Sequence, residues 1–144
     1  MTRVSQLLQE KACQVWYVTP SSSIREALKL MAEKQVGAVV VMEGGKIVGI
    51  FSERDFARKA ISAPITMDTP VRELMVSPVY YVTPDQSVED CMALMTQHRF
   101  RHLPVLEGDQ LIGIISIGDV VKRLLLEKDA TIKSLEDYIW VNMI

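Results

Sequence analysis

Several features that mark specialised protein classes are scarce in this 144-residue chain. The two cysteines, Cys13 and Cys91, lie far apart and form no Cys-x-x-Cys motif, which excludes a disulfide-rich secreted scaffold. Apolar runs such as 38–42 are far too short to cross a bilayer, and the N-terminal residues have no signal-peptide core. We therefore expect a cytoplasmic protein that does not bind membranes.

Charge of one sign and aromatic residues are also in short supply. Sixteen basic residues nearly balance eighteen acidic ones, and aromatic residues make up 6% of the chain. A basic nucleic-acid surface and an aromatic stacking platform are therefore not expected. With 49% hydrophobic residues and a net charge of −2, the chain has the composition of a globular domain that can fold without metal or disulfides.

The dominant feature of the sequence is an internal repeat. A shift of 64 residues places 15–55 on 79–119 without a gap, and 15 of these 41 positions are identical. A shorter prefix, 4–8, matches 71–75 at a shift of 67. The chain has the length of one typical domain, but the repeat divides it into two similar halves.

Each copy reads as a β-α-β-β-α unit. Ser23 precedes apolar residues at helical spacing, with Glu26 completing a capping-box pattern, and Ser87 with Asp90 is its weaker copy. The expected strands are continuous apolar runs separated by Gly-containing turns, which predicts a sheet covered by helices. We predict strands at 36–42, 46–51, 100–106 and 110–115 and second helices at 53–61 and 117–128. The expected organisation of this α/β (α+β) chain is repeat 1 at 4–61, a linker at 62–70, repeat 2 at 71–128, and a short C-terminal helix or tail at 129–144.

These residues resemble a known family. The order Val-Thr-Pro, Ser-Ile or Ser-Val, Leu-Met and Gly-Ile-x-Ser-x-x-Asp, found twice, is similar to the CBS domain, and two tandem copies resemble a Bateman module. The resemblance covers about 4–126, and 52–59 and 101–105 look most like stand-alone bacterial CBS pairs. It implies two units related by a pseudo-twofold axis, a homodimer, and adenosine ligands in the clefts between the copies. The implied ligands are AMP, ADP or ATP, with NAD possible and S-adenosylmethionine less favoured.

The main candidate site is the Gly-x-x-Ser-x-x-Asp motif of each copy. Ser52 and Ser116 stand where a strand passes into a helix, with Asp55 and Asp119 in the first helical turn. The unpaired backbone amides at a helix N-terminus can donate hydrogen bonds to a phosphate, and a carboxylate can accept hydrogen bonds from ribose hydroxyls. The same Ser-x-x-Asp spacing also forms a capping box that needs no ligand. The family pattern favours ribose binding.

Further candidates surround this motif. The resemblance suggests that Thr19 serves the Asp119 cleft and Thr83 the Asp55 cleft, although a Thr-Pro step also fits a simple strand-to-helix turn. Arg101 and His102 offer donors to phosphate, whereas their counterparts in the first copy, Gly37 and Ala38, are small and apolar. We therefore expect phosphate to bind better in the cleft of Asp119, Ser116, Arg101 and His102.

Two basic residues beyond the motif and one pair of histidines are also considered as ligand-binding positions. Arg58 and Lys122 follow the two aspartates by three residues, where each side chain either reaches a phosphate or lies on a solvated helix face. The i, i+4 spacing of His98 and His102 does not predict a metal site, because the repeat places the first at a helix end and the second in a strand. Ala38 completes the predicted ligand-binding set.

Three functions fit this pattern. A regulatory nucleotide sensor without catalysis is favoured, because no nucleophile–base arrangement and no Walker-type loop is present. The alternatives are an enzyme that uses NAD or another adenosine cofactor, and a protein-interaction module with empty clefts. The regulated partner cannot be named from the sequence.

Overall fold

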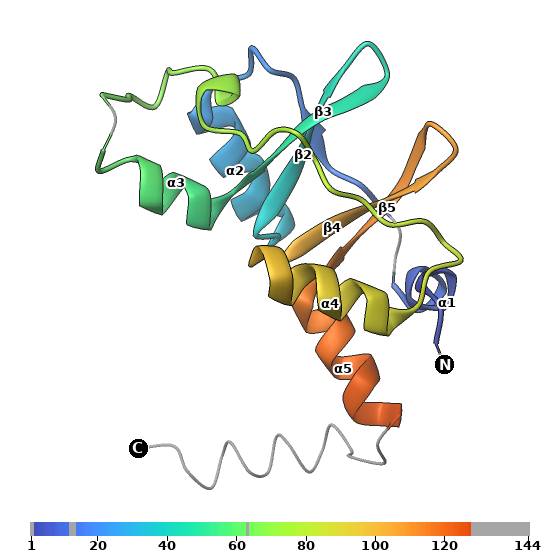
Figure 1. The fold of residues 1–144 in the computed structure, drawn as a ribbon. Helices are drawn as coiled ribbons and strands as arrows, with labels where there is room; N and C mark the ends of the chain where they lie inside the picture. The colour runs from blue at the N-terminus through green and yellow to red at the C-terminus, as the bar shows by residue number, and fades with distance from the viewer. Residues whose placement is uncertain (1, 12–13, 63, 128–144) are drawn as a thin grey trace, which may run out of the picture.

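The computed structural model describes residues 2–11, 14–62 and 64–127 (Figure 1). The first copy contains β1 (Tyr17–Val18), α2 (Ile24–Lys34), β2 (Ala38–Glu43), β3 (Lys46–Ser52) and α3 (Glu53–Lys59). The second contains α4 (Val88–His98), β4 (His102–Glu107), β5 (Gln110–Ser116) and α5 (Ile117–Glu127). The helix α1 (Val4–Glu10) forms the prefix of the first copy, and the 3-10 helix η1 (Val71–Glu73) belongs to the prefix of the second. This mixed α+β architecture confirms the predicted fold class.

The two hairpins have the same register. Ala38 pairs with Ser52 in the first copy, and His102 pairs with Ser116 in the second. Each hairpin has one irregularity at the same position, after Val41 and after Val105. The 64-residue shift found in the sequence therefore holds at the level of individual backbone pairs.

The predicted element bounds differ at several places. β2 and β4 begin two residues later than expected, because Gln35 and Arg99 take the left-handed conformation that ends the preceding helices. α3 stops at Lys59. The first strand of the second copy is reduced to a single parallel bridge between Val82 and Val105. The C-terminal helix expected within 129–144 lies outside the described residues.

Helix capping follows the sequence pattern, with one reversal. In α2, the Ser23 hydroxyl accepts a hydrogen bond from the Glu26 amide. In α4, the Ser87 hydroxyl accepts from the Asp90 amide, and the Ser87 amide donates to the Asp90 carboxylate. The weaker sequence match therefore forms the complete reciprocal capping box.

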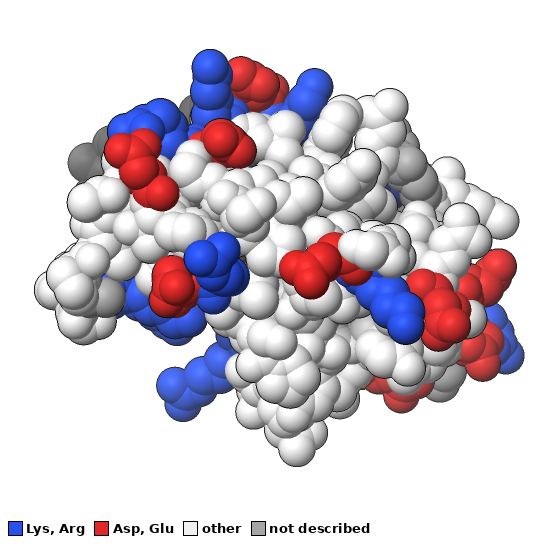
Figure 2. Space-filling model, turned by 90° about the horizontal axis from the view of Figure 1, so that it is seen from above, with Lys and Arg blue, Asp and Glu red and all other residues white. Residues whose placement is uncertain are grey.

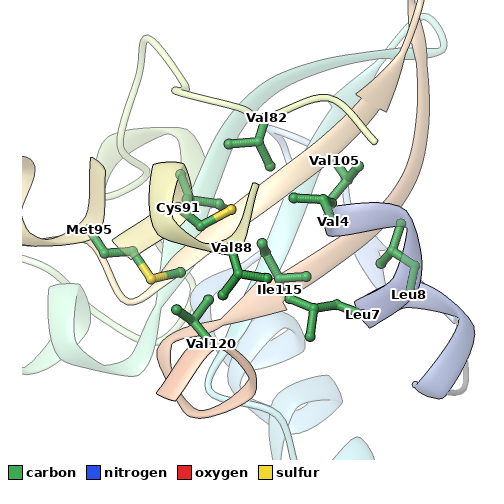
Figure 3. Packing of buried hydrophobic residues seen from close by; sticks show 11 residues of the cluster. Val4, Leu7, Leu8, Val82, Val88, Cys91, Met95, Val105, Ile115 and Val120 are labelled. Carbon is green, nitrogen blue, oxygen red and sulfur yellow. The ribbon is translucent and has the colours of Figure 1, made fainter. Parts of the chain in front are cut away.

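The prefix of each copy packs into the core of the other copy. Val4, Leu7 and Leu8 of α1 belong to the buried cluster of the second copy, beside Val88 and Ile115 (Figure 3). The prefix of the second copy behaves in the same way, because Val71 and Leu74 are buried in the cluster of the first copy. Backbone hydrogen bonds fix both exchanges, from the Val4 amide to the Gln86 carbonyl and from the Val71 amide to the Ser22 carbonyl. The packing units therefore cross the boundaries of the sequence repeats.

Two glycines allow these prefixes to approach the sheets. A Cβ on Gly113 would lie 2.6 Å from Leu8 Cδ2, and one on Gly49 would lie 2.5 Å from Met75 Sδ. Both contacts are far shorter than van der Waals separation. Leu8 and Met75 are equivalent residues of the two prefixes. The repeated Gly-Ile step therefore has a packing reason in each copy.

We expect Gly113→Ala to lower the free energy of unfolding by about 1–3 kcal/mol, because the new methyl group displaces Leu8 and α1. Urea unfolding followed by circular dichroism measures the change. Gly118→Ala is the matched control, since its Cβ would lie 3.6 Å from Ser116 Oγ at the start of α5, and we expect it to be neutral or stabilising. Equal losses in both variants would contradict this account.

Cys91 is a small buried residue of the second core. Its side chain is fully buried in the second core, and burial raises the pKa of its thiol to about 11 (Figure 3). A thiol with this pKa is protonated at neutral pH and unreactive. Cys13 lies outside the described residues.

Candidate functional site

A pocket of about 370 Å³ lies between the two copies. The first copy contributes the ends of the β2–β3 hairpin and the start of α3, and the second contributes the turn between α4 and β4. Its volume falls within the range of small-molecule sites. The lining residues are Gly37, Ala38, Ile50, Ser52, Glu53, Arg54, Asp55, Arg58, Val76, His98, Arg99, Phe100, Arg101 and His102.

The Ser-x-x-Asp motif of the first copy forms one wall of this pocket. Ser52 caps α3, because its hydroxyl accepts a hydrogen bond from the Asp55 amide at 3.1 Å. The same hydroxyl donates to Asp55 Oδ2 at 2.8 Å. Asp55 is half-buried, with its carboxylate oriented by this contact. The capping interpretation is thus correct for Ser52, and the carboxylate also faces a pocket.

The equivalent motif of the second copy is engaged by an internal cation. Lys11 Nζ lies 2.7 Å from Asp119 Oδ2 and donates a second hydrogen bond to the Ile114 carbonyl at 3.1 Å. The Ser116 amide donates to the same Asp119 oxygen at 2.8 Å. Partial burial raises the pKa of Asp119, but the bonds from Lys11 and Ser116 outweigh it and hold the pKa below its usual value. Asp119 is therefore ionised and already paired with Lys11, whereas Asp55 forms no ion pair within the part of the chain that the structure describes.

Because of the ion pair between Lys11 and Asp119, the free energy of unfolding should depend on pH in the acid range. Asp119 has a lower pKa in the folded state than in the unfolded chain, so its contribution is complete above the ordinary aspartate pKa of about 4 and is lost as the pH falls through the folded value. We expect Lys11→Met to cost about 1 kcal/mol at neutral pH, a modest effect because both side chains are partly exposed.

As the pH falls from about 5 to 3, the Lys11→Met variant should lose less stability than the wild type. Urea unfolding across this range provides the test. Arg72→Met, which removes an exposed ion pair with Glu73, serves as the control and should follow the wild-type curve. Parallel wild-type and Lys11→Met curves would show that Lys11 does not set the pKa of Asp119.

Arg101 and His102 lie on the wall of the Asp55 pocket. The sequence had grouped both with Asp119, which belongs to the same copy. The structure instead places the start of β4 against the start of α3 of the other copy, so that a Cβ on Gly37 would lie 3.3 Å from Glu53 and 3.6 Å from the His102 ring. Burial lowers the pKa of His102, with a further lowering from Lys11 that Asp119 partly opposes. His102 therefore lines the Asp55 pocket, and its lowered pKa favours the neutral imidazole at pH 7.

The other predicted residues divide into two groups. Ala38 and Arg58 line the pocket together with Ser52 and Asp55. Thr19 and Thr83 are not among its lining residues; each forms local turn contacts, with Ser22 and with Asp85 and Gln86 respectively. Their geometry matches the simple turn that the sequence left open. Lys122 is exposed on α5 and does not line the pocket.

The sequence reasoning missed several lining residues. Arg54 and Arg99 lie on opposite walls, and Val76, from the segment after η1, reaches the pocket through paired backbone bonds with Ile50. His98 and Phe100 stack at 5.4 Å between ring centroids, with Tyr80 against both. The signal for Arg54 and Arg99 was available, since each replaces an uncharged residue of the other copy.

Comparison with known protein families identifies both halves of the chain. The model of the CBS domain matches residues 5–62 and again 71–126. The chain belongs to the CBS-domain family. It is a tandem CBS pair, as the repeat and its motifs predicted.

Related proteins share this organisation. The CBS domain-containing protein YhcV of Bacillus subtilis is 35% identical over 117 residues, covering 81% of this chain and 84% of its own. A candidate signal-transduction protein with CBS domains from Burkholderia ambifaria is 47% identical, with a TM-score of 0.84 over 91% of this chain and 99% of that one. The structure of CBSX2 in complex with AMP is 29% identical, with a TM-score of 0.70 over 89% and 99% of the two chains. Some CBS pairs therefore bind adenosine ligands, which supports a ligand-binding regulatory module here.

The described surface and helices were compared with the features of nucleic-acid-binding, membrane and metal proteins. Acidic and basic side chains are interspersed on the face shown in Figure 2, without a continuous field of one sign. Among the described helices, none is long and apolar enough to cross a membrane. Within residues 2–11, 14–62 and 64–127, no group of three or more His, Cys, Asp or Glu side chains gathers as a metal site.

Proposed function

We propose that this CBS pair is a regulatory module that binds an adenosine nucleotide in the Asp55 pocket, without catalysing a reaction. The single observation that carries the proposal is the meeting of an oriented carboxylate with cationic side chains from the other copy. Asp55 would accept hydrogen bonds from the ribose hydroxyls, and Arg58, Arg101 and His102 would hold phosphate. The apolar lining of Ala38, Ile50 and Val76 suits the base.

We further propose that the chain binds one nucleotide, in this pocket and not beside Asp119. Lys11 already donates to the Asp119 carboxylate, so a ribose there would have to displace a paired ammonium group. This reverses the preference drawn from the sequence, which expected Asp119 to mark the better phosphate cleft. Isothermal titration calorimetry with the preferred nucleotide should give one site per chain, and two equal sites would contradict the assignment.

Ligand binding would act by changing association between chains. A groove between α4 and α5 is lined by apolar side chains, Met92, Val121, Leu124 and Leu125, with Glu89 and Glu127 at its edge. Val121, one of these lining residues, is exposed. A second copy of the chain, as in a CBS-pair homodimer, would cover this face. Light scattering with and without nucleotide tests the proposal, and a monomer at all concentrations would contradict it.

A thermal-shift series tests the proposed function as a whole. We expect at least one of AMP, ADP, ATP and NAD to raise the Tm, because a ligand at 100 times its Kd adds about 2.7 kcal/mol to the folded state. The absence of any shift at millimolar concentration would favour the ligand-free interaction module instead. An enzyme using an adenosine cofactor would be favoured only by turnover of a substrate.

A further inference from the structure

The residues of the Asp55 pocket differ in charge from their counterparts in the other copy. Four arginines line the Asp55 pocket, and each comes from a position whose counterpart carries a different residue. The shift of 64 pairs Arg54 with Gly118, Arg58 with Lys122, Arg99 with Gln35, and Arg101 with Gly37. The counterpart positions therefore contain one cation where this pocket has four. The concentration of guanidinium groups is therefore a property of this pocket and not of the repeat.

The arginines form two pairs on facing walls. Arg54 and Arg58 lie on α3, whereas Arg99 and Arg101 lie between α4 and β4 of the other copy. Within the described residues, none of the four forms an ion pair with a carboxylate. Burial lowers the pKa of Arg54, the nearby charges of Arg101 and Arg58 lower it further, and Asp55 partly opposes them.

The charge balance of the pocket favours a polyanion. Four arginines face the two carboxylates of Glu53 and Asp55, so these six side chains carry an excess of two positive charges. A guanidinium group binds phosphate through paired hydrogen bonds, and bonds between charged groups are the stronger ones. A ligand with two or more phosphates can reach both arginine pairs, whereas one phosphate group satisfies fewer of the donors.

We propose that this pocket selects adenosine ligands by charge: it binds the di- and triphosphate more tightly than the monophosphate, and it rejects the cationic sulfonium of S-adenosylmethionine. The inference rests on the proposed function, because it assumes that the adenosine part binds here. Arg54 and Arg99 are the specificity-determining residues, since their counterparts in the other copy are Gly118 and Gln35.

A charge series on one adenosine scaffold tests the proposal. Calorimetry with the full chain would compare adenosine, AMP, ADP, ATP, 5′-methylthioadenosine and S-adenosylmethionine. We expect ADP and ATP to bind about tenfold or more tightly than AMP, and S-adenosylmethionine to bind more weakly than its uncharged thioether counterpart. Added salt should weaken ADP binding and leave adenosine binding unchanged.

Matched variants separate charge selection from a structural role. Arg99→Gln introduces the residue that the first copy has in the same left-handed position, Gln35, so the fold should tolerate it. We expect Arg99→Gln and Arg54→Gln to weaken ADP binding about tenfold each, while adenosine binding stays unchanged. Arg72→Gln, an exposed change of the same charge on η1, should alter neither.

The outcomes distinguish charge selection from nucleotide binding itself. Equal affinities for AMP and ADP, or equal affinities for S-adenosylmethionine and methylthioadenosine, would overturn charge selection while the proposed function stands. Loss of adenosine and ADP binding in equal proportion in both variants would assign the arginines a structural role. Absence of binding by all six compounds would overturn the proposed function itself.

Discussion

Phe51→Ala is expected to lower the free energy of unfolding by about 3–5 kcal/mol. Phe51 is fully buried and is the largest completely enclosed side chain among the described residues. It lies on β3 within the core of the first copy, together with Val71 and Leu74 from the prefix of the second copy. The cavity left by alanine would therefore loosen the contact through which one copy holds the prefix of the other.

Urea unfolding measures this effect, and Phe51→Leu provides the matched control. Leucine keeps most of the apolar volume, and we expect a loss below about 1.5 kcal/mol. Because a domain of this size has a total stability of only about 5–15 kcal/mol, the alanine variant should also melt well below the wild type. A loss under 1 kcal/mol for Phe51→Ala would show that the surrounding core collapses into the space.

Asp55→Ala is expected to weaken nucleotide binding by about 10- to 100-fold. The substitution removes the carboxylate that Ser52 orients, and a hydrogen bond to a charged group contributes about 1.5–3 kcal/mol. Calorimetry with ADP measures the change. Ser52 still caps α3 in this variant, because its hydroxyl accepts from the backbone amide of residue 55. The fold should therefore stay intact, which circular dichroism would verify.

Asp119→Ala is the control within the same chain. It removes the equivalent carboxylate of the second copy and leaves Lys11 without this partner, so it should cost stability but change nucleotide affinity little. A larger loss of affinity in Asp119→Ala than in Asp55→Ala would place the nucleotide in the other cleft. The pair of variants thus tests the assignment of the site with the same residue type in both copies.

The sequence predicted the local structure of each copy well. The repeat fixed the order of helices and strands, because apolar spacing and the Ser-x-x-Glu or Ser-x-x-Asp caps act within a few residues of one another. The strand bounds were less exact. Gln35 and Arg99 end their helices in the left-handed conformation, which glycine or asparagine usually marks and which the sequence therefore did not reveal.

The candidate site was predicted in its parts but not in its grouping. Ser52, Asp55, Arg58, Arg101 and His102 were selected individually from the motif and from the chemistry of phosphate binding, and all five line one pocket. Whether they form one site depends on which segment of one copy packs against the start of α3 in the other. The internal repeat does not show this packing. Nothing in the motif indicates that Lys11, at the end of the prefix helix, reaches Asp119.

The sequence by itself determined that this protein consists of two similar units with one carboxylate motif each. Only the tertiary structure decided that the two motifs are unequal. The prefix helix α1 crosses into the second copy, and its end brings Lys11 to Asp119, while the start of β4 brings arginines to Asp55. Local propensity and periodicity specify elements, but contacts between residues more than a hundred positions apart, such as Lys11 with Asp119, depend on how the finished elements pack.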